Sequence, residues 1–276
     1  MAGDTIPVAL TIAGSDSGGG AGIQADLKTF HAFGVFGTSA VTAITAQNTL
    51  GVSAVHPVPA DVVRAQIDAV ASDLRPAAVK SGMLATAELV ETVARAIEEH
   101  GLPRYVLDPV MVASSGDRLL DADAEEAVAS RLLPLATLVT PNLHEARILT
   151  GQDVASVDHM RRAARALVDM GAGAALVKGG HLAGERAVDL LFDGTTERLW
   201  RRSRLRTRNT HGTGCTLSAG VAACLARDLP LSVSVDRAVD FVARAIAGAP
   251  GLGSGHGPVD HFAGVAHVPP GAPDRD

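Results

Sequence analysis

The chain has 276 residues, of which 47% are hydrophobic and 3% aromatic, and its formal net charge is −6. This composition is typical of a globular protein with a large core and excludes an intrinsically disordered one. An acidic chain with few aromatic side chains has neither a basic stripe nor stacking platforms, so we expect no nucleic-acid partner. No apolar run reaches the ~18 residues of a membrane span and no secretory signal is recognisable. We therefore expect no membrane partner and a cytoplasmic location.

Short apolar runs alternate with helical patterns along the chain. The predicted strands are 6–12, 37–46, 77–80, 105–107, 138–139 and 174–177, and the predicted helices are 22–33, 61–74, 86–100, 121–132, 157–170, 214–227 and 231–247. This alternation is typical of an α/β protein with a mostly parallel sheet and helices on both faces. Between 187 and 200, two strand-like runs around Asp193-Gly194 predict a late β-hairpin.

The domain organisation follows from what separates these elements. Nothing that resembles a linker divides residues 1–267, so we expect a single domain there. The segment 268–276 is rich in proline and charge, and we expect it to be disordered. The two cysteines, Cys215 and Cys224, lie nine residues apart on one predicted helix, too far for a disulfide at ~1.5 Å rise per residue. Cys224 lies among Ala and Leu and is predicted to pack in the core.

The segment 209–218 is predicted to bind an anion. Its glycines open directly onto an apolar helix, and the first N–H groups of a helix have no partner within it. Gly212 and Gly214 allow the main chain to approach a phosphate, with Thr213 between them, and Cys215 follows in the first turn, where the helix field favours a thiolate. The alternative is a glycine-rich loop that only starts a helix.

Several polar residues directly follow predicted strands. Since the carboxyl ends of parallel strands meet at one edge of a sheet, we expect Gln47, Asp108, Asn142, Glu145 and Lys178 to line one crevice. Glu145 is suited to a hydrated Mg²⁺, and Lys178 to a polyphosphate. The alternatives are a helix cap for the pair Asn142 and Glu145, and a turn residue before proline for Asp108.

Two common nucleotide motifs are absent. No lysine occupies the P-loop frame Gly-x-x-x-x-Gly-Lys-Ser/Thr, which excludes a P-loop. Residues 20–25 approach the dinucleotide fingerprint, but no Asp or Glu follows Asp26 before Asp61, so the acid that binds a ribose is missing. A dehydrogenase is therefore not expected.

The chain resembles the ribokinase-like superfamily, and within it the hydroxymethylpyrimidine/phosphomethylpyrimidine kinases of thiamine biosynthesis, from Ile6 to about Phe262. The motifs that carry the resemblance are TIAGSDSGGGAGIQADLKT (11–29), TAQNT (45–49), KSGML (80–84), DPVMV (108–112), TPN (140–142), KGGH (178–181), NTHGTGCTLS (209–218) and GHGPV (255–259). The resemblance implies a ribokinase-like three-layer α/β/α sandwich and a homodimer. It also implies a kinase that uses ATP and Mg²⁺ to phosphorylate 4-amino-5-hydroxymethyl-2-methylpyrimidine, and then the resulting monophosphate, at one site.

The resemblance also implies roles for individual residues. The substrate pocket would contain Gln47, Gly14, Asp26, Met83 and Val110, with the amide of Gln47 at the pyrimidine edge. The magnesium region would contain Asp108 and Glu145, and the nucleotide-phosphate region Asn142, Lys178 and Thr213. Cys215 would replace the aspartate base of the sugar kinases, and the main-chain N–H groups of Gly212, Thr213, Gly214 and Cys215 would stabilise the transferring phosphoryl group.

Two alternatives remain open from the sequence. Pyridoxal kinases share this scaffold, but such relatives tend to replace the pocket glutamine and to carry a second cysteine after the 108–112 motif, where this chain has Ala113 and Ser114. A non-catalytic pyrimidine-binding module is the other, although catalysis alone explains why Asp108, Glu145 and Lys178 occur together with the 212–215 turn. The segment 113–118 is a candidate lid over the substrate.

Overall fold

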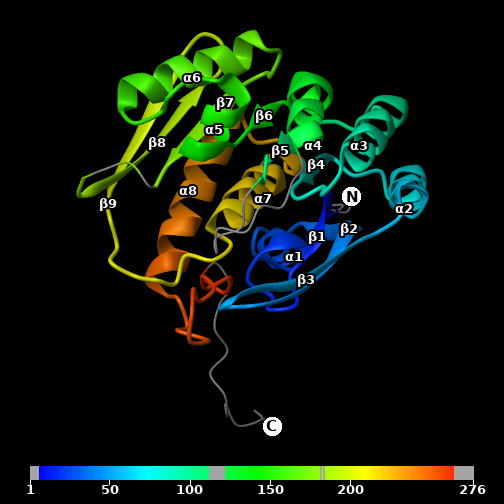
Figure 1. Cartoon of the computed structure of the whole chain (residues 1–276), viewed down its shortest axis with the longest axis horizontal. Helices are drawn as coiled ribbons and strands as arrows, with labels where there is room; N and C mark the ends of the chain where they lie inside the picture. Colours follow the sequence, from blue (N-terminus) through cyan, green and yellow to red (C-terminus); the bar gives the residue numbers. More distant parts are fainter. Residues whose placement is uncertain (1–5, 112–121, 181, 183, 264–276) are drawn as a thin grey trace, which may run out of the picture.

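The computed structural model describes residues 6–111, 122–180, 182 and 184–263. A nine-stranded sheet in the order β3-β2-β1-β4-β5-β6-β7-β8-β9 runs through this part of the chain (Figure 1). Its strands are β1 Val8–Ser15, β2 Phe36–Asn48, β3 Gly51–Pro57, β4 Ala78–Ser81, β5 Tyr105–Leu107, β6 Leu138–Val139, β7 Ala175–Gly179, β8 Arg186–Phe192 and β9 Glu197–Ser203. The six strands from β2 to β7 in this order pair in parallel, and β3, β8 and β9 join the edges in antiparallel pairs.

Helices cover both faces of the sheet (Figure 1). One layer consists of α1 Gly22–Ala32, α7 Thr213–Ala226 and α8 Leu231–Ala247, and the other of α2 Ala60–Asp73, α3 Ala87–His100, α4 Ala122–Ala127, α5 Leu143–Thr150 and α6 Val157–Asp169. A π-turn at Val128–Leu132 and a 3₁₀ turn at Leu133–Leu135 follow α4. The three-layer α/β/α sandwich expected from the sequence is confirmed.

The buried strands explain why two helical layers form. Successive side chains of a strand point to opposite faces, and in the central strands both sets are apolar. In β5, for example, Tyr105 and Leu107 belong to the core beneath α2 to α6, whereas Val106 belongs to the core beneath α1, α7 and α8. Each face of the sheet therefore needs its own layer of helices.

The late hairpin forms where the sequence predicts it. Phe192 of β8 pairs with Glu197 of β9, and the Asp193 carboxylate accepts hydrogen bonds from the main-chain N–H groups of Thr195 and Thr196. The edge strand β3, exposed or half-buried at every residue, was not predicted. Of α5, a helix of eight residues, only the start at Asn142 was predicted.

Two predictions fall outside the described residues: the lid at 113–118 and the disordered tail at 268–276. Within the described part of the chain, no helix is both long enough and apolar enough to span a membrane.

Candidate active site

The turn at the start of α7, which the sequence predicts to bind an anion, packs directly against the first glycine loop. Gly212 is the N-cap of α7 and has a φ of 79°. A Cβ atom at Gly212 would lie 1.8 Å from the carbonyl oxygen of Gly20, so no other residue fits there without moving one of the loops. A Cβ atom at Gly214 would lie 3.2 Å from Lys178 Nζ. The amide groups of this turn therefore lie between the first glycine loop and a lysine.

Lys178 lies at the carboxyl end of β7 and joins the turn to Asp108. Its Nζ donates a hydrogen bond of 2.9 Å to Asp108 Oδ1, and the Thr140 hydroxyl lies 3.3 Å from the same oxygen. Burial alone would lower the pKa of Lys178, but the carboxylates of Asp108 and Glu145 raise it, so the ammonium group stays charged. Asp108 Oδ2 is buried and has no hydrogen-bond partner within the described part of the chain. Such an orphaned acceptor needs a cation or a donor from a ligand.

Asn142 and Glu145 form a complete capping box at the start of α5. Asn142 Oδ1 accepts from the N–H groups of His144 and Glu145, and Glu145 Oε2 accepts from the Asn142 N–H at 2.7 Å. Burial and the nearby Asp108 raise the pKa of Glu145 to about 7. The prediction that Asn142 and Glu145 cap a helix is thus confirmed. The Met111 N–H also interacts with the Glu145 carboxylate, so this side chain is held by main-chain groups on two sides.

Cys215 lies in the first turn of α7, as expected, and its side chain is half-buried. Burial, together with the carboxylates of Asp108 and Asp26, raises the pKa of Cys215 to about 11, whereas the charge of Lys80 and the Gly22 N–H lower it. The expected effect of the helix N-terminus on the thiolate stays a prediction.

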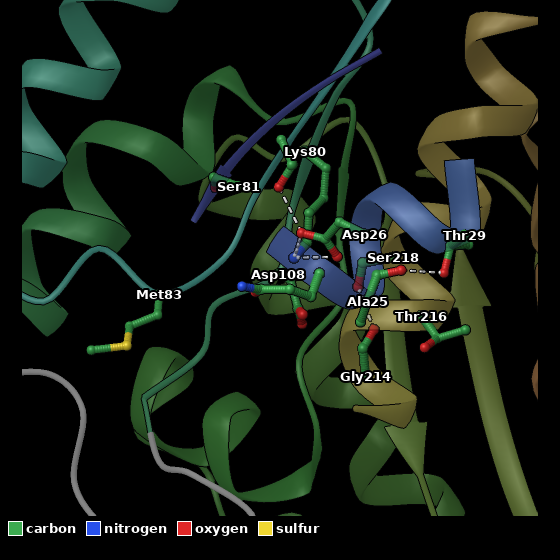
Figure 2. Close-up of polar contacts among 12 residues, drawn as sticks. Ala25, Asp26, Thr29, Lys80, Ser81, Met83, Asp108, Gly214, Thr216 and Ser218 are labelled. Atoms are coloured by element: carbon green, nitrogen blue, oxygen red, sulfur yellow. Dashed lines mark hydrogen bonds and ion pairs between the residues drawn. The ribbon is translucent and has the colours of Figure 1, made fainter. Parts of the chain in front are cut away.

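Asp26 forms a buried ion pair with Lys80, a residue that the sequence did not assign to the site. Both side chains are fully buried, and Lys80 Nζ lies 3.0 and 2.8 Å from the two carboxylate oxygens of Asp26. The Thr11 hydroxyl donates to Asp26 Oδ2 at 2.6 Å. Figure 2 shows Asp26 and Lys80 pointing toward each other, with Asp108 beside them. The partners of Asp26 thus lie within the protein, and its contact with substrate stays a prediction.

The remaining expected pocket residues lie at the same edge of the sheet. Gly14 is at the end of β1, and a Cβ atom there would lie 3.3 Å from Met83 Sδ. Met83 points away from the Lys80–Asp26 pair (Figure 2). Val110 follows Asp108 and packs on the larger core, half-buried. The Thr213 hydroxyl donates to the Thr210 carbonyl at 3.0 Å.

Gln47, at the end of β2, is half-buried beside a histidine and an aspartate that the sequence did not single out. Gln47 Nε2 lies 3.4 Å from His211 Nε2, and His211 Nε2 lies 2.8 Å from Asp16 Oδ2. Asp16 also accepts hydrogen bonds from the N–H groups of Gly18, Gly20 and Ala21. Although burial opposes ionisation, these bonds lower the pKa of Asp16. His211 thereby connects the first glycine loop, the α7 turn and Gln47.

The family model for phosphomethylpyrimidine kinase matches residues 16–260, which include every site residue described above except Thr11 and Gly14. The chain belongs to the phosphomethylpyrimidine kinase family. Curated relatives in this family include the hydroxymethylpyrimidine/phosphomethylpyrimidine kinase of Rhizobium meliloti, 55% identical over 92% of this chain and 97% of the relative. The Bacillus subtilis protein of the same name is 50% identical over 92% of this chain and 94% of the relative.

Solved structures with this fold have two different names. The phosphomethylpyrimidine kinase of Clostridium difficile has a TM-score of 0.79 and 40% identity, covering 87% of this chain and 99% of its own. An ADP complex of Bacillus subtilis pyridoxal kinase has a TM-score of 0.88 and 40% identity, and the match covers 94% of this chain and 98% of the pyridoxal kinase. The fold of this phosphomethylpyrimidine kinase family member therefore does not by itself distinguish a pyrimidine from a pyridoxal substrate.

Proposed function

We propose that this protein is a hydroxymethylpyrimidine/phosphomethylpyrimidine kinase that acts in thiamine diphosphate biosynthesis. It transfers a phosphoryl group from ATP to the alcohol of 4-amino-5-hydroxymethyl-2-methylpyrimidine, and then a second one to the monophosphate. The observation that carries the proposal is the α7 turn held against Lys178, beside a buried carboxylate oxygen of Asp108 that lacks a partner. The names of relatives 45–55% identical over most of the chain support the same substrate.

The turn and Lys178 would neutralise the charge of the transferring phosphoryl group. The first main-chain N–H groups of α7 would face the phosphates, where the helix dipole adds partial positive charge, although that of Thr213 also donates to the Thr210 carbonyl at 3.3 Å. Lys178 adds a full charge beside Gly214. Because phosphoryl transfer depends mainly on positioning and charge stabilisation, these groups supply most of what the reaction needs. Asn142 is next to Lys178 through a β-bridge and would contact the nucleotide phosphates with its amide nitrogen.

The residues present fit a magnesium ion bound together with nucleotide phosphates. The described residues contain no group of three or more His, Cys, Asp or Glu side chains that would hold a metal ion alone. Mg²⁺ in phosphoryl-transfer enzymes instead uses one or two carboxylates, phosphates and water. Asp108, through its unpartnered Oδ2, and the carboxylate of Glu145 would be those ligands. When bound, the ion would offset the negative charge of the nucleotide phosphates.

Cys215 would take the proton from the substrate hydroxyl. A thiol with a pKa of about 11 gives a strongly basic thiolate, but only a small fraction of the ligand-free protein carries it at neutral pH. The loose transition state of phosphoryl transfer tolerates this, since the hydroxyl does not need to be ionised before attack.

Pyridoxal phosphorylation is the second candidate, favoured by the close fold of a Staphylococcus aureus pyridoxal kinase solved with AMP-PCP and pyridoxal, which has a TM-score of 0.86. Gln47 argues for the pyrimidine, because an amide both donates and accepts and so matches an aminopyrimidine edge. Initial rates on the two alcohols distinguish the candidates, and a higher kcat/KM on pyridoxal would reverse the assignment.

Mass spectrometry of the products tests the proposal. Incubation of the pyrimidine alcohol with the protein and Mg·ATP is expected to give the monophosphate first and the diphosphate later. Saturable pyrimidine binding without ADP release would instead indicate a non-catalytic binding module. We further propose a cytoplasmic homodimer, and sedimentation analysis of the purified protein tests the dimer.

A further inference from the structure

The side-chain amide of Gln47 lies between two polar groups that decide its orientation. Its Nε2 atom lies 3.4 Å from His211 Nε2, and its Oε1 atom lies 3.3 Å from the Thr45 hydroxyl oxygen. The oxygen and nitrogen of a carboxamide have nearly the same shape, so hydrogen-bond partners determine which of them points where. Both partners of Gln47 have a fixed donor or acceptor role.

His211 Nε2 is a donor. It lies 2.8 Å from Asp16 Oδ2, and the Asp16 carboxylate already accepts three main-chain N–H groups, from Gly18, Gly20 and Ala21. A carboxylate with these partners is ionised and has no proton to give, so the proton in this contact belongs to the imidazole. This holds for the neutral ring and for the imidazolium. When Gln47 Nε2 lies on the His211 side, its N–H groups face the protonated Nε2 of His211, so two donors meet.

The Thr45 hydroxyl is an acceptor toward Gln47. A hydroxyl group has a single proton, and Thr45 Oγ1 donates it to the Ser15 carbonyl at 2.8 Å, a shorter contact than the 3.3 Å to Gln47. Toward Gln47 the hydroxyl therefore offers only a lone pair. When Gln47 Oε1 lies on the Thr45 side, it faces a lone pair of the Thr45 hydroxyl, so two acceptors meet. When the amide turns by 180°, the contact with Thr45 becomes a hydrogen bond, and the amide oxygen faces the N–H that His211 donates to Asp16, as a second and longer contact of that N–H.

We propose that the Gln47 amide points Oε1 toward His211 and Nε2 toward Thr45, and that His211 is the positioning residue that fixes this orientation and thereby selects the pyrimidine edge. The inference rests on the proposed function, in which Gln47 contacts the substrate ring. One N–H on the Thr45 side and one lone pair on the His211 side remain for the ligand. The matching edge has a ring nitrogen that accepts next to an amino group that donates, as in a 4-aminopyrimidine.

The proposal predicts discrimination against a 4-oxo pyrimidine. The 4-oxo analogue presents an acceptor and a ring N–H in the reverse order, so it pairs with Gln47 only if the amide turns back. In the wild-type protein that turn recreates the donor–donor contact with His211, whose N–H is held by Asp16. Because a buried polar group left unpaired is unfavourable, we expect a preference of roughly 100-fold or more in kcat/KM for the 4-amino substrate.

Two variants that differ by one methylene group test the role of His211. The amide nitrogen of His211→Gln reaches the place of Nε2, whereas that of His211→Asn stops near Nδ1. His211→Gln is expected to keep most of the preference for the 4-amino alcohol over its 4-oxo analogue, and His211→Asn to lose at least roughly 10-fold of it. The melting temperature of each variant serves as the readout for a general loss of structure. Equal preferences in both variants would overturn the proposal.

The ring nitrogen itself can be observed in the wild-type protein. Long-range ¹H–¹⁵N correlation spectra of the protein labelled at its ten histidines give the tautomer of each, and the signals missing from His211→Gln identify residue 211. A proton on Nε2 is expected, and a bare Nε2 would overturn the proposal. This result does not depend on turnover. A wild-type protein that phosphorylates neither pyrimidine refutes the proposed function alone.

Discussion

Replacement of Gly212 by alanine tests the contact between the α7 turn and the first glycine loop. A Cβ atom at Gly212 would lie 1.8 Å from the Gly20 carbonyl oxygen, whereas an ordinary contact begins at 3.4 Å. The two loops would therefore have to separate by about 1.6 Å (3.4 − 1.8). The φ of 79° adds a backbone penalty of about 1–2 kcal/mol for a residue with a Cβ.

A separation of this size moves the main-chain N–H groups that would stabilise the phosphoryl group. A misplacement of about 1 Å at a reacting centre lowers the rate by roughly 100-fold, so kcat is expected to fall by at least that factor. His211 moves with the turn, and the KM for the pyrimidine is expected to rise as well. The assay is ADP release at saturating ATP, with thermal unfolding measured on the same samples.

Gly101→Ala provides the matched control. Gly101 ends α3 with a φ of 57°, and nothing lies within 4 Å of the position of its Cβ. This variant carries a similar backbone penalty without a clash, so we expect a lower melting temperature and an unchanged kcat. If Gly212→Ala turned over as fast as Gly101→Ala, the close contact between Gly212 and the Gly20 carbonyl would not be needed to position the turn.

Three further predictions concern buried charges. Lys80→Met leaves Asp26 buried without its ion-pair partner and should lower the free energy of unfolding by about 3–5 kcal/mol in urea titrations. The double variant Asp26→Asn/Lys80→Met should recover part of this loss. No recovery in the double variant would show that the ion pair is unimportant for stability. Burial lowers the pKa of His261 from 6.5 to about 4, so the unfolded chain binds the extra proton between these values. Stability is then full above pH 6.5 and falls by about 3 kcal/mol toward pH 4, a slope that His261→Gln should remove. Asp108→Asn should need more Mg²⁺ for half its maximal rate, because a neutral amide replaces the unpartnered oxygen; a Mg²⁺ dependence equal to that of the wild type would contradict a role in metal binding.

The sequence predicts the central elements well because their signals are local. The strand at 105–107 is continuously apolar, and the hairpin around Asp193 has a strong turn signal, so both were found. The edge strand β3 was missed because all its residues are exposed or half-buried and lack the alternation that marks one buried face. The helix α5 was missed although its cap was recognised, because eight residues give little periodicity.

The site was predicted only where a motif or the end of a strand marks it. Lys178 follows a predicted strand, and the structure brings it to Asp108 as expected. The pair of Lys80 and Asp26 joins residues 54 positions apart, and no local pattern predicts such a contact. His211 lies within the 209–218 motif, but its role depends on Asp16, which becomes its neighbour only through the fold. The pKa of Cys215 could not be predicted because burial is a property of the packed structure.

The most direct test of a single site for both transfers is a single-turnover comparison of wild type and Cys215→Ala by mass spectrometry. The reaction would be followed from the pyrimidine alcohol and, separately, from its monophosphate. Both steps are expected to slow by a similar large factor while ATP binding changes little, because one sulfur atom serves both reactions. Retention of either step at the wild-type rate would contradict it.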